Sequence, residues 1–214
     1  MITPRYAGGL AVVNDNFVLY LGGINSESTL QSVNVLDLTS ESPHWGPTYN
    51  MLSKRRWFGV GVIYNCMYAE GGFDSEQRLS SVECYHPSLN KWTPIADMCV
   101  RRNAVGVGVL DDVLYAVGGW DGHQVWSSVE AYSPSTGVWS TIPDMHLSRR
   151  GAGVAVLGGL LYVVGGYDGA SVLDSVESYN PKTNKWTMIT ASMNVARSFA
   201  GAVAIDVPQY CKTY

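Results

Sequence analysis

The chain has 214 residues, of which 46% are hydrophobic and 15% are charged, and its formal net charge is −4 at pH 7. This composition excludes a disordered chain and is sufficient for a core of substantial size. The small negative charge gives no general indication of nucleic-acid binding. The 23 glycines and seven tryptophans favour an all-β protein rich in turns.

The sequence carries no evident targeting or membrane segment. It has no Asn-x-Ser/Thr sequon, no signal peptide and no Cys-x-x-Cys pair among its four cysteines at 66, 84, 99 and 211. Cys66 and Cys84 fall within predicted strands, where a small buried apolar residue is the simpler interpretation. The uncharged stretch 151–167 approaches the length of a membrane span, but the matching segments contain Asn14-Asp15-Asn16 and Asp111-Asp112. We therefore predict a soluble cytoplasmic protein with no membrane and no nucleic-acid partner.

A tandem repeat of about 47 residues fills almost the whole chain. Tryptophans lie at 45, 92, 139 and 186, diglycines begin at 22, 71, 118 and 165, and methionines recur at 1, 51, 98, 145 and 193. The fourth residue after each of these methionines is arginine and the eighth is glycine. Each repeat has four short apolar or alternating runs separated by turn residues, which predicts a four-stranded antiparallel sheet.

The recurring residues suggest how each sheet is built, from its first strand to its last. The glycine in the first strand allows close approach at a central axis, and the diglycine ends the second strand. A tyrosine three residues before the diglycine and the tryptophan of the fourth strand are suited to packing between sheets. A glutamate recurs in the third strand, where we expect the recurring arginine as its partner: Glu83, Glu130 and Glu177.

The segments GGFDSEQRLSSVECYHPSLNKW, GGWDGHQVWSSVEAYSPSTGVW and GGYDGASVLDSVESYNPKTNKW resemble kelch repeats, and in particular those of the kelch-like (BTB-kelch) family. This resemblance implies an all-β fold, a β-propeller in which each repeat is one blade. In chain order the blades are 1–50, 51–97, 98–144 and 145–192, followed by the first strand of a fifth blade in 193–206 and a non-repeat tail, 207–214. The kelch-repeat propeller thus covers 1–206.

Two departures from the pattern are expected to matter. In blade 1, Asn34 replaces the glutamate and the turn before Trp45 is longer, so this blade should be the least regular. Kelch-like propellers resemble six-bladed rings, so four blades and one strand predict an incomplete ring, with a closed four-bladed ring as the alternative. An open arc would expose a sheet edge and blade faces.

No enzyme, metal or cofactor site is predicted. The four histidines at 44, 86, 123 and 146 have no shared spacing and fall in predicted turns or loops. The two Gly-Val-Gly runs, beginning at 59 and 106, belong to repeated strands rather than to phosphate-binding loops. Acidic residues at 74, 121 and 168 recur in the loop after the diglycine, where they are expected to form turns.

A binding face remains as the functional candidate. Nine of the 14 Lys and Arg residues lie in turns between one blade and the next, and a propeller places such turns on one face: Arg5, Lys54, Arg55, Arg56, Arg101, Arg102, Arg149, Arg150 and Arg197. The loops after the diglycines should reach the same face. We predict that the partner-binding residues are Arg56, Phe73, Arg78, Asn103, Trp120, His123, Trp126, Arg150, Tyr167, Ser171 and Ser198.

Positions that vary between blades on a repeated scaffold are the better candidates for binding, and the loop residues add aromatic area and polar contacts. The arginine four residues after each methionine is constant and therefore structural, whereas the next position is Tyr6, Arg56, Asn103, Arg150 or Ser198. Trp126 matches Leu79 and Leu173 of the neighbouring repeats, so simple packing stays open as its alternative role.

The resemblance implies a non-enzymatic protein-interaction module, similar to the substrate-recognition propeller of a BTB-kelch adaptor for a cullin-RING ubiquitin ligase. A basic face with aromatic residues suits a short acidic or phosphorylated segment of a substrate protein. Cullin binding is expected only if a longer form carries a BTB region. The alternative is an actin-binding kelch protein.

Overall fold

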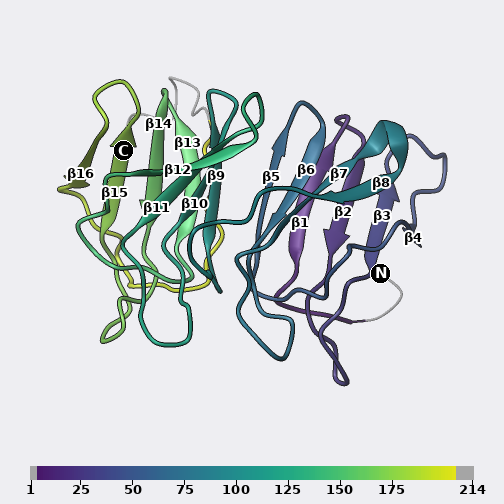
Figure 1. Cartoon of the computed structure of the whole chain (residues 1–214), viewed down its shortest axis with the longest axis horizontal. Helices are drawn as coiled ribbons and strands as arrows, with labels where there is room; N and C mark the ends of the chain where they lie inside the picture. Colours follow the sequence, from purple (N-terminus) through teal and green to yellow (C-terminus); the bar gives the residue numbers. More distant parts are fainter. Residues whose placement is uncertain (1–3, 206–214) are drawn as a thin grey trace.

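The computed structural model describes residues 4–205, which form four antiparallel sheets of four strands each (Figure 1). In each sheet the strands are hydrogen bonded in sequence order, so every sheet is a meander and forms one blade. The strand bounds are, in blade 1, β1 (Gly9–Val13), β2 (Phe17–Leu21), β3 (Val33–Asp37) and β4 (Trp45–Pro47); in blade 2, β5 (Gly59–Ile63), β6 (Cys66–Glu70), β7 (Val82–His86) and β8 (Lys91–Pro94); in blade 3, β9 (Gly106–Leu110), β10 (Val113–Val117), β11 (Val129–Ser133) and β12 (Val138–Ile142); in blade 4, β13 (Gly153–Leu157), β14 (Leu160–Val164), β15 (Val176–Asn180) and β16 (Lys185–Ile189).

The polar residues that interrupt the apolar runs are hairpin turns. Leu110 pairs with Val113, and Asp111 and Asp112 between them have φ of 51° and 59°. Two successive residues with positive φ match the right-handed twist of the flanking strands, which is why short hairpins favour them. Within residues 4–205, no helix is long and apolar enough to cross a membrane.

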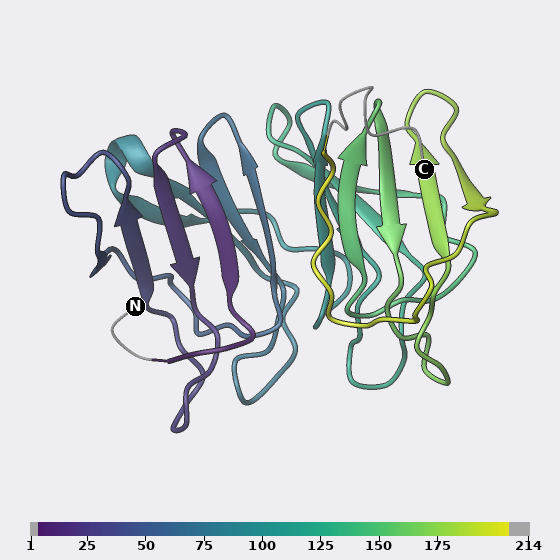
Figure 2. The ribbon, with the colours of Figure 1, turned by 180° about the vertical axis from the view of Figure 1, so that it is seen from behind.

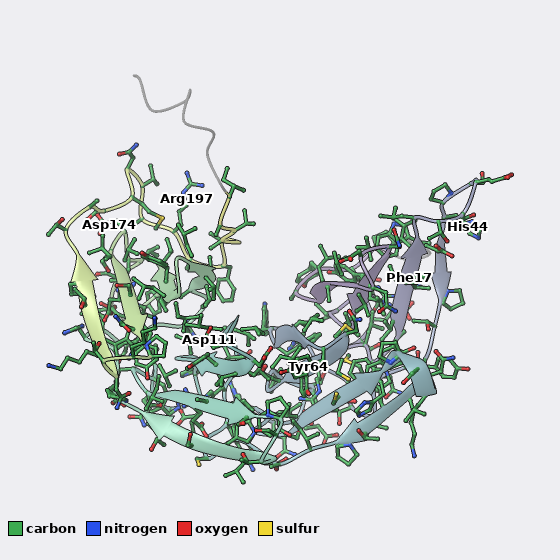
Figure 3. All side chains as sticks on the ribbon, turned by 90° about the horizontal axis from the view of Figure 1, so that it is seen from above. Phe17, His44, Tyr64, Asp111, Asp174 and Arg197 are labelled. Carbon is green, nitrogen blue, oxygen red and sulfur yellow. The ribbon has the colours of Figure 1, made fainter. Side chains whose placement is uncertain are left out.

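The four blades stand side by side in an open arc (Figure 3). Blades 1 and 4 form its two arms, seen at Phe17 and Asp174, while Tyr64 and Asp111 mark its concave side. A Cβ added to Gly106 of β9 would lie 2.6 Å from Val154 Cγ2 of β13. The expected role of this recurring glycine, close approach of the first strands, is therefore confirmed.

The core lies between blades, in three apolar clusters that each join two adjacent sheets. Tyr68 of blade 2 packs against Tyr132 of blade 3 with ring centroids 6.0 Å apart, and Tyr132 packs against Trp139 at 5.2 Å. The Trp139 Nε1–H also donates to the carbonyl of Ala96, which lies in the segment between β8 of blade 2 and the start of blade 3. The predicted role of the repeated aromatic residues between sheets is thus confirmed.

The recurring arginine and glutamate form buried ion pairs, as predicted. In blade 3, Arg102 Nη2 lies 2.9 Å from Glu130 Oε1, and both side chains are only 1% exposed. Arg102 also donates to the carbonyls of Gly118 and Ser128, so its charge is held by three separate groups. The same pairs form in blades 2 and 4, Arg55 with Glu83 and Arg149 with Glu177.

Blade 1 is the least regular blade, as predicted. Its fourth strand has three residues, and Asn34, in the place of the glutamate, donates to the Gly46 carbonyl while its Oδ1 has no partner among the described residues. Trp45 is half-buried, whereas Trp92 is 4% exposed.

The start of a fifth repeat lies against blade 4 but is not a strand. Residues 199–205 run back along the sheet of β13, as the yellow segment in Figure 2 shows. Phe199 N–H donates to the Gly151 carbonyl, and Ala202 approaches Gly153 as Val154 approaches Gly106. The segment has the position of a first strand, but it forms no sheet hydrogen bonds because no second strand is present among the described residues. The predicted tail, 207–214, lies outside the described residues.

Candidate functional site

In each blade the loop between the second and third strands projects beyond the sheet, and these loops gather at the lower edge of the molecule in Figure 1. There the residue after the recurring arginine forms a β-bridge with the residue after the diglycine. The residue after the diglycine forms a second β-bridge with a residue five positions later in the same loop. We call this surface the loop face. The three paired positions are, in order, Tyr6, Ile24 and Thr29 in blade 1; Arg56, Phe73 and Arg78 in blade 2; Asn103, Trp120 and Val125 in blade 3; and Arg150, Tyr167 and Val172 in blade 4.

Arginine and aromatic side chains alternate across this face from blade 2 to blade 4. Arg56 Cζ lies 4.6 Å from the Trp57 ring centroid and 4.9 Å from that of Phe73. Arg78 Cζ lies 5.0 Å from Phe73 and 4.3 Å from Trp120. Arg150 Cζ is 5.0 Å from Trp120 and 4.9 Å from Tyr167, so that every guanidinium lies between two rings. These seven residues form the Arg–aromatic ladder.

The ladder arginines have no acidic partner among the described residues. All salt bridges found in residues 4–205 involve Arg55, Arg102, Arg149 or His146. The Nε atoms of Arg56, Arg78 and Arg150 are also buried without a hydrogen-bond partner in this part of the chain. Stacking fixes the plane of each guanidinium and leaves its charge uncompensated, which is the arrangement that planar anions such as carboxylates recognise.

A chain of backbone hydrogen bonds crosses the blades directly behind the ladder. Trp57 N–H donates to Ala7 O, Ala104 N–H to Trp57 O, and Gly151 N–H to Ala104 O, over 2.7–2.8 Å. These residues follow Tyr6, Arg56, Asn103 and Arg150, and all have positive φ. Each variable position is therefore next to a residue that is hydrogen bonded to the neighbouring blade.

The acidic residues of the loops are used within the loops. In each of blades 2–4 the first acidic residue accepts two backbone N–H bonds through one oxygen: Asp74, Asp121 and Asp168. The bonds from Ser171 and Ala170 hold the pKa of Asp168 below its usual range. The prediction that these residues form turns is confirmed, and none of the three carboxylates forms a salt bridge within residues 4–205.

A pocket of about 490 Å³ opens on the loop face between blades 3 and 4. It is lined by Trp120, His123, Gln124, Val125, Arg150, Tyr167, Asp168 and Gly169. Four predicted site residues therefore meet there, and a cation, a histidine and two aromatic rings converge on one concave surface. Such a pocket suits an anionic side chain with apolar flanks.

Comparison with protein families decides the family. The Kelch motif matches three times, at residues 55–98, 101–146 and 148–192, which together cover more than half of the chain. The chain is a kelch-repeat protein. Kelch propellers are in general non-catalytic interaction domains, and membership implies a protein-interaction module.

Comparison with solved structures supports the propeller. The structure of YjhT is similar to this kelch chain with a TM-score of 0.77 and 18% sequence identity, over 90% of this chain and 67% of that one. At this identity the likeness concerns the fold alone. A comparison with curated protein sequences finds no match.

Four predicted site residues of the kelch blades belong neither to the ladder nor to the pocket: Asn103, Trp126, Ser171 and Ser198. Asn103 is buried, and Ser198 lies at the open end of the arc beyond blade 4. Trp126 accepts the Arg149 N–H through its carbonyl, as Leu79 accepts that of Arg102. Trp126 therefore occupies the same repeat position as these leucines, and its side chain is half-buried. Ser171 is exposed in the blade 4 loop, and its N–H caps Asp168.

The expected basic face is smaller than the sequence indicates. Arg55, Arg102 and Arg149 are at most 1% exposed and are paired with glutamates, so they add no free charge to the surface. Trp57 was not predicted and closes the ladder at blade 2. Its signal in the sequence is an aromatic residue where the other blades have Ala7, Ala104 and Gly151.

One group of potential metal-ligand atoms lies away from the loop face. Cys66, Cys84 and His86 lie in blade 2, and their ligand atoms are all within 4.8 Å of one another. His86 is the last residue of β7, so its predicted place in a turn or loop is wrong. Burial raises the pKa of the free Cys84 thiol to about 12, so this thiol is protonated at neutral pH unless a cation displaces its proton.

Proposed function

We propose that the loop face binds a short acidic or phosphorylated segment of a partner protein, with the Arg–aromatic ladder as its centre. The observation that carries this proposal is that Arg56, Arg78 and Arg150 each lie between two aromatic rings and have no carboxylate partner among the described residues. Charge-assisted bonds to a carboxylate or phosphate supply the affinity, and the rings supply apolar contact area.

The blade arrangement favours an extended or turn-forming segment rather than a single anion. The ladder crosses three blades, while the pocket beside Trp120 and Arg150 is one local depression within it. An acidic residue of the partner enters this pocket, and a neighbouring one pairs with Arg78. Two anionic groups a few residues apart are therefore required for full affinity.

We further propose that this propeller is the substrate-recognition part of a BTB-kelch type adaptor for a cullin-RING ubiquitin ligase, and that it performs no catalysis itself. Support comes from the kelch motif and from the three kelch-like segments in blades 2 to 4. Cullin contact would be made by a BTB region in a longer form of the protein, and the propeller would supply substrate selectivity.

The test is a fluorescence-polarisation titration with a labelled octapeptide of alternating glutamate and glycine, and with a phosphoserine version. Arg78→Ala and Arg150→Ala should each weaken binding about tenfold and reduce its dependence on salt, because each removes a charge-assisted contact. Arg101→Ala is the matched control, since Arg101 is an exposed arginine outside the ladder. Equal affinities for all three variants would contradict the proposed site.

The alternative, actin binding, is distinguished by co-sedimentation with filamentous actin. Pelleting of the protein with filaments, unaffected by Arg78→Ala and Arg150→Ala, would favour the actin function over the peptide site.

A further inference from the structure

Cys66, Cys84 and His86 occupy one face of blade 2, toward blade 3. Met67 pairs with Tyr85 and Tyr68 with Cys84, so the same register places Cys66 opposite His86. Cys84 lies diagonally from Cys66 on that face and belongs to the apolar cluster between blades 2 and 3. Three soft donors are therefore held on two adjacent strands rather than on a mobile loop.

Packing does not require these residue types. The equivalent positions in blade 3 are Val113, Ala131 and Ser133, and in blade 4 they are Leu160, Ser178 and Asn180. The same inter-blade contact is thus formed elsewhere with ordinary apolar and small polar side chains. The replacement of all three positions by metal-ligand residues is confined to blade 2 within the four described blades.

Hydrogen bonds around His86 orient its ring with one nitrogen toward the thiols. The Thr93 hydroxyl donates to the Cys84 carbonyl at 3.5 Å, so its oxygen is free to accept from His86 Nε2–H at 3.2 Å. His86 Nδ1 then carries the lone pair, and it lies 3.4 Å from Cys66 Sγ. A polar partner on the far ring nitrogen is the usual second contact of a histidine that binds metal.

The separation of 3.4 Å between Cys66 Sγ and His86 Nδ1 and the charges of the three groups suit zinc. Zn–S and Zn–N bonds of about 2.3 and 2.0 Å in a tetrahedron place the ligand atoms roughly 3.5 Å apart. Two thiolates and a neutral imidazole balance the charge of a divalent cation, and a half-buried site favours such a neutral set. Cys66 and His86 are each partly exposed, so the fourth position is open to water and the ion has a route of entry.

We propose that blade 2 binds one Zn²⁺ ion through Cys66 Sγ, Cys84 Sγ and His86 Nδ1, with a water molecule as the fourth ligand. Zinc takes the place of the two thiol protons and links β6 to β7 next to the interface with blade 3.

The experiment uses the full chain, stripped with EDTA, kept reduced with a phosphine and titrated with ZnCl₂ against a chromophoric chelator. We expect one zinc per chain, and with CoCl₂ the intense visible bands and thiolate charge transfer of a tetrahedral site. The variants take their residues from blade 3, so the fold should tolerate them: Cys66→Val, Cys84→Ala and His86→Ser. Cys99→Ala is the control, because Cys99 is exposed and outside the cluster.

Each of the three cluster variants should lower zinc affinity at least tenfold, while Cys99→Ala should retain the wild-type value. Zinc should also raise the melting temperature of the wild type and of Cys99→Ala but not that of His86→Ser. The proposal would be overturned by folded, reduced wild-type protein that binds no stoichiometric zinc. Zinc binding that survives both His86→Ser and Cys84→Ala would overturn it equally.

Discussion

Glu70 shows how one residue can depart from the repeat at a cost to stability. It is fully buried, and neither carboxylate oxygen has a hydrogen-bond partner among the described residues. The equivalent positions are Leu21, Val117 and Val164. Burial raises the pKa of Glu70 to about 8, against the opposing effect of Arg102 and Arg55, while Glu130 adds to the rise.

This residue makes stability depend on pH. The unfolded chain releases the Glu70 proton near pH 4.5, whereas the folded protein releases it near pH 8. The contribution of this proton to the free energy of unfolding is therefore complete below pH 4.5 and is lost as the pH rises to about 8. We expect the free energy of unfolding to fall by about 3 kcal/mol from pH 5.5 to 8, at about 1.4 kcal/mol per pKa unit. Urea unfolding at both pH values measures it.

Glu70→Val should remove most of this slope and increase stability at pH 8 by about 1–4 kcal/mol, because a packed apolar side chain replaces a buried acid. Glu76→Gln is the control, since Glu76 is exposed on a loop of the same blade. A Glu70→Val protein that is less stable than the wild type at pH 8 would show that the carboxylate has a stabilising role.

At the scale of the blade, the buried Arg–Glu pair connects three parts of the repeat. Glu130 on β11 accepts N–H bonds from Cys99 and Val100 in the turn that enters blade 3, and it pairs with Arg102. Arg102 in turn holds the carbonyls after β10 and before β11. One ion pair therefore fixes the entry turn against two strands.

Glu130→Gln should destabilise the protein by about 3–5 kcal/mol, because it leaves Arg102 buried without an anion. Amide hydrogen exchange of Cys99 and Val100 should accelerate as their acceptor weakens. Ser128→Ala removes only the bond from Arg102 to the Ser128 hydroxyl and should cost about 1 kcal/mol. If the two variants lost equal stability, the ion pair would not be the main connection.

The blade was predictable because its signals are local or recur. Alternating runs and turn residues define the strands, and the constant offset between Arg102 and Glu130 identifies the pair. The ladder was predictable only in part, since Arg78 reaches Trp120 across a blade boundary, and that contact depends on how two sheets are oriented. His86 was misplaced because its turn signal, the following Pro87, begins one residue after the strand ends.

At the scale of the whole molecule, the first strands set the spacing of the blades and thereby the spacing of the ladder. Phe73 and Arg78 belong to blade 2, Trp120 to blade 3 and Arg150 to blade 4, so a change in the approach of one sheet to the next alters the ladder distances. The recurring glycine in the sequence indicates the close approach of the first strands. It does not indicate the curvature of the arc, because that curvature follows from the packing of all three interfaces between blades.

Gly106 and Gly201 provide a matched test, because they occupy the same repeat position in different surroundings. A Cβ on Gly106 would lie 2.6 Å from Val154 Cγ2, whereas nothing lies within 4 Å of one on Gly201. Gly106→Ala should therefore cost about 1–3 kcal/mol and Gly201→Ala less than about 0.5 kcal/mol in urea unfolding. Because Gly106 separates β9 from β13, its variant should also weaken binding of the acidic peptide by displacing Arg150 from Trp120. Unchanged peptide affinity in a clearly destabilised Gly106→Ala protein would mean that blade spacing and ladder geometry are independent.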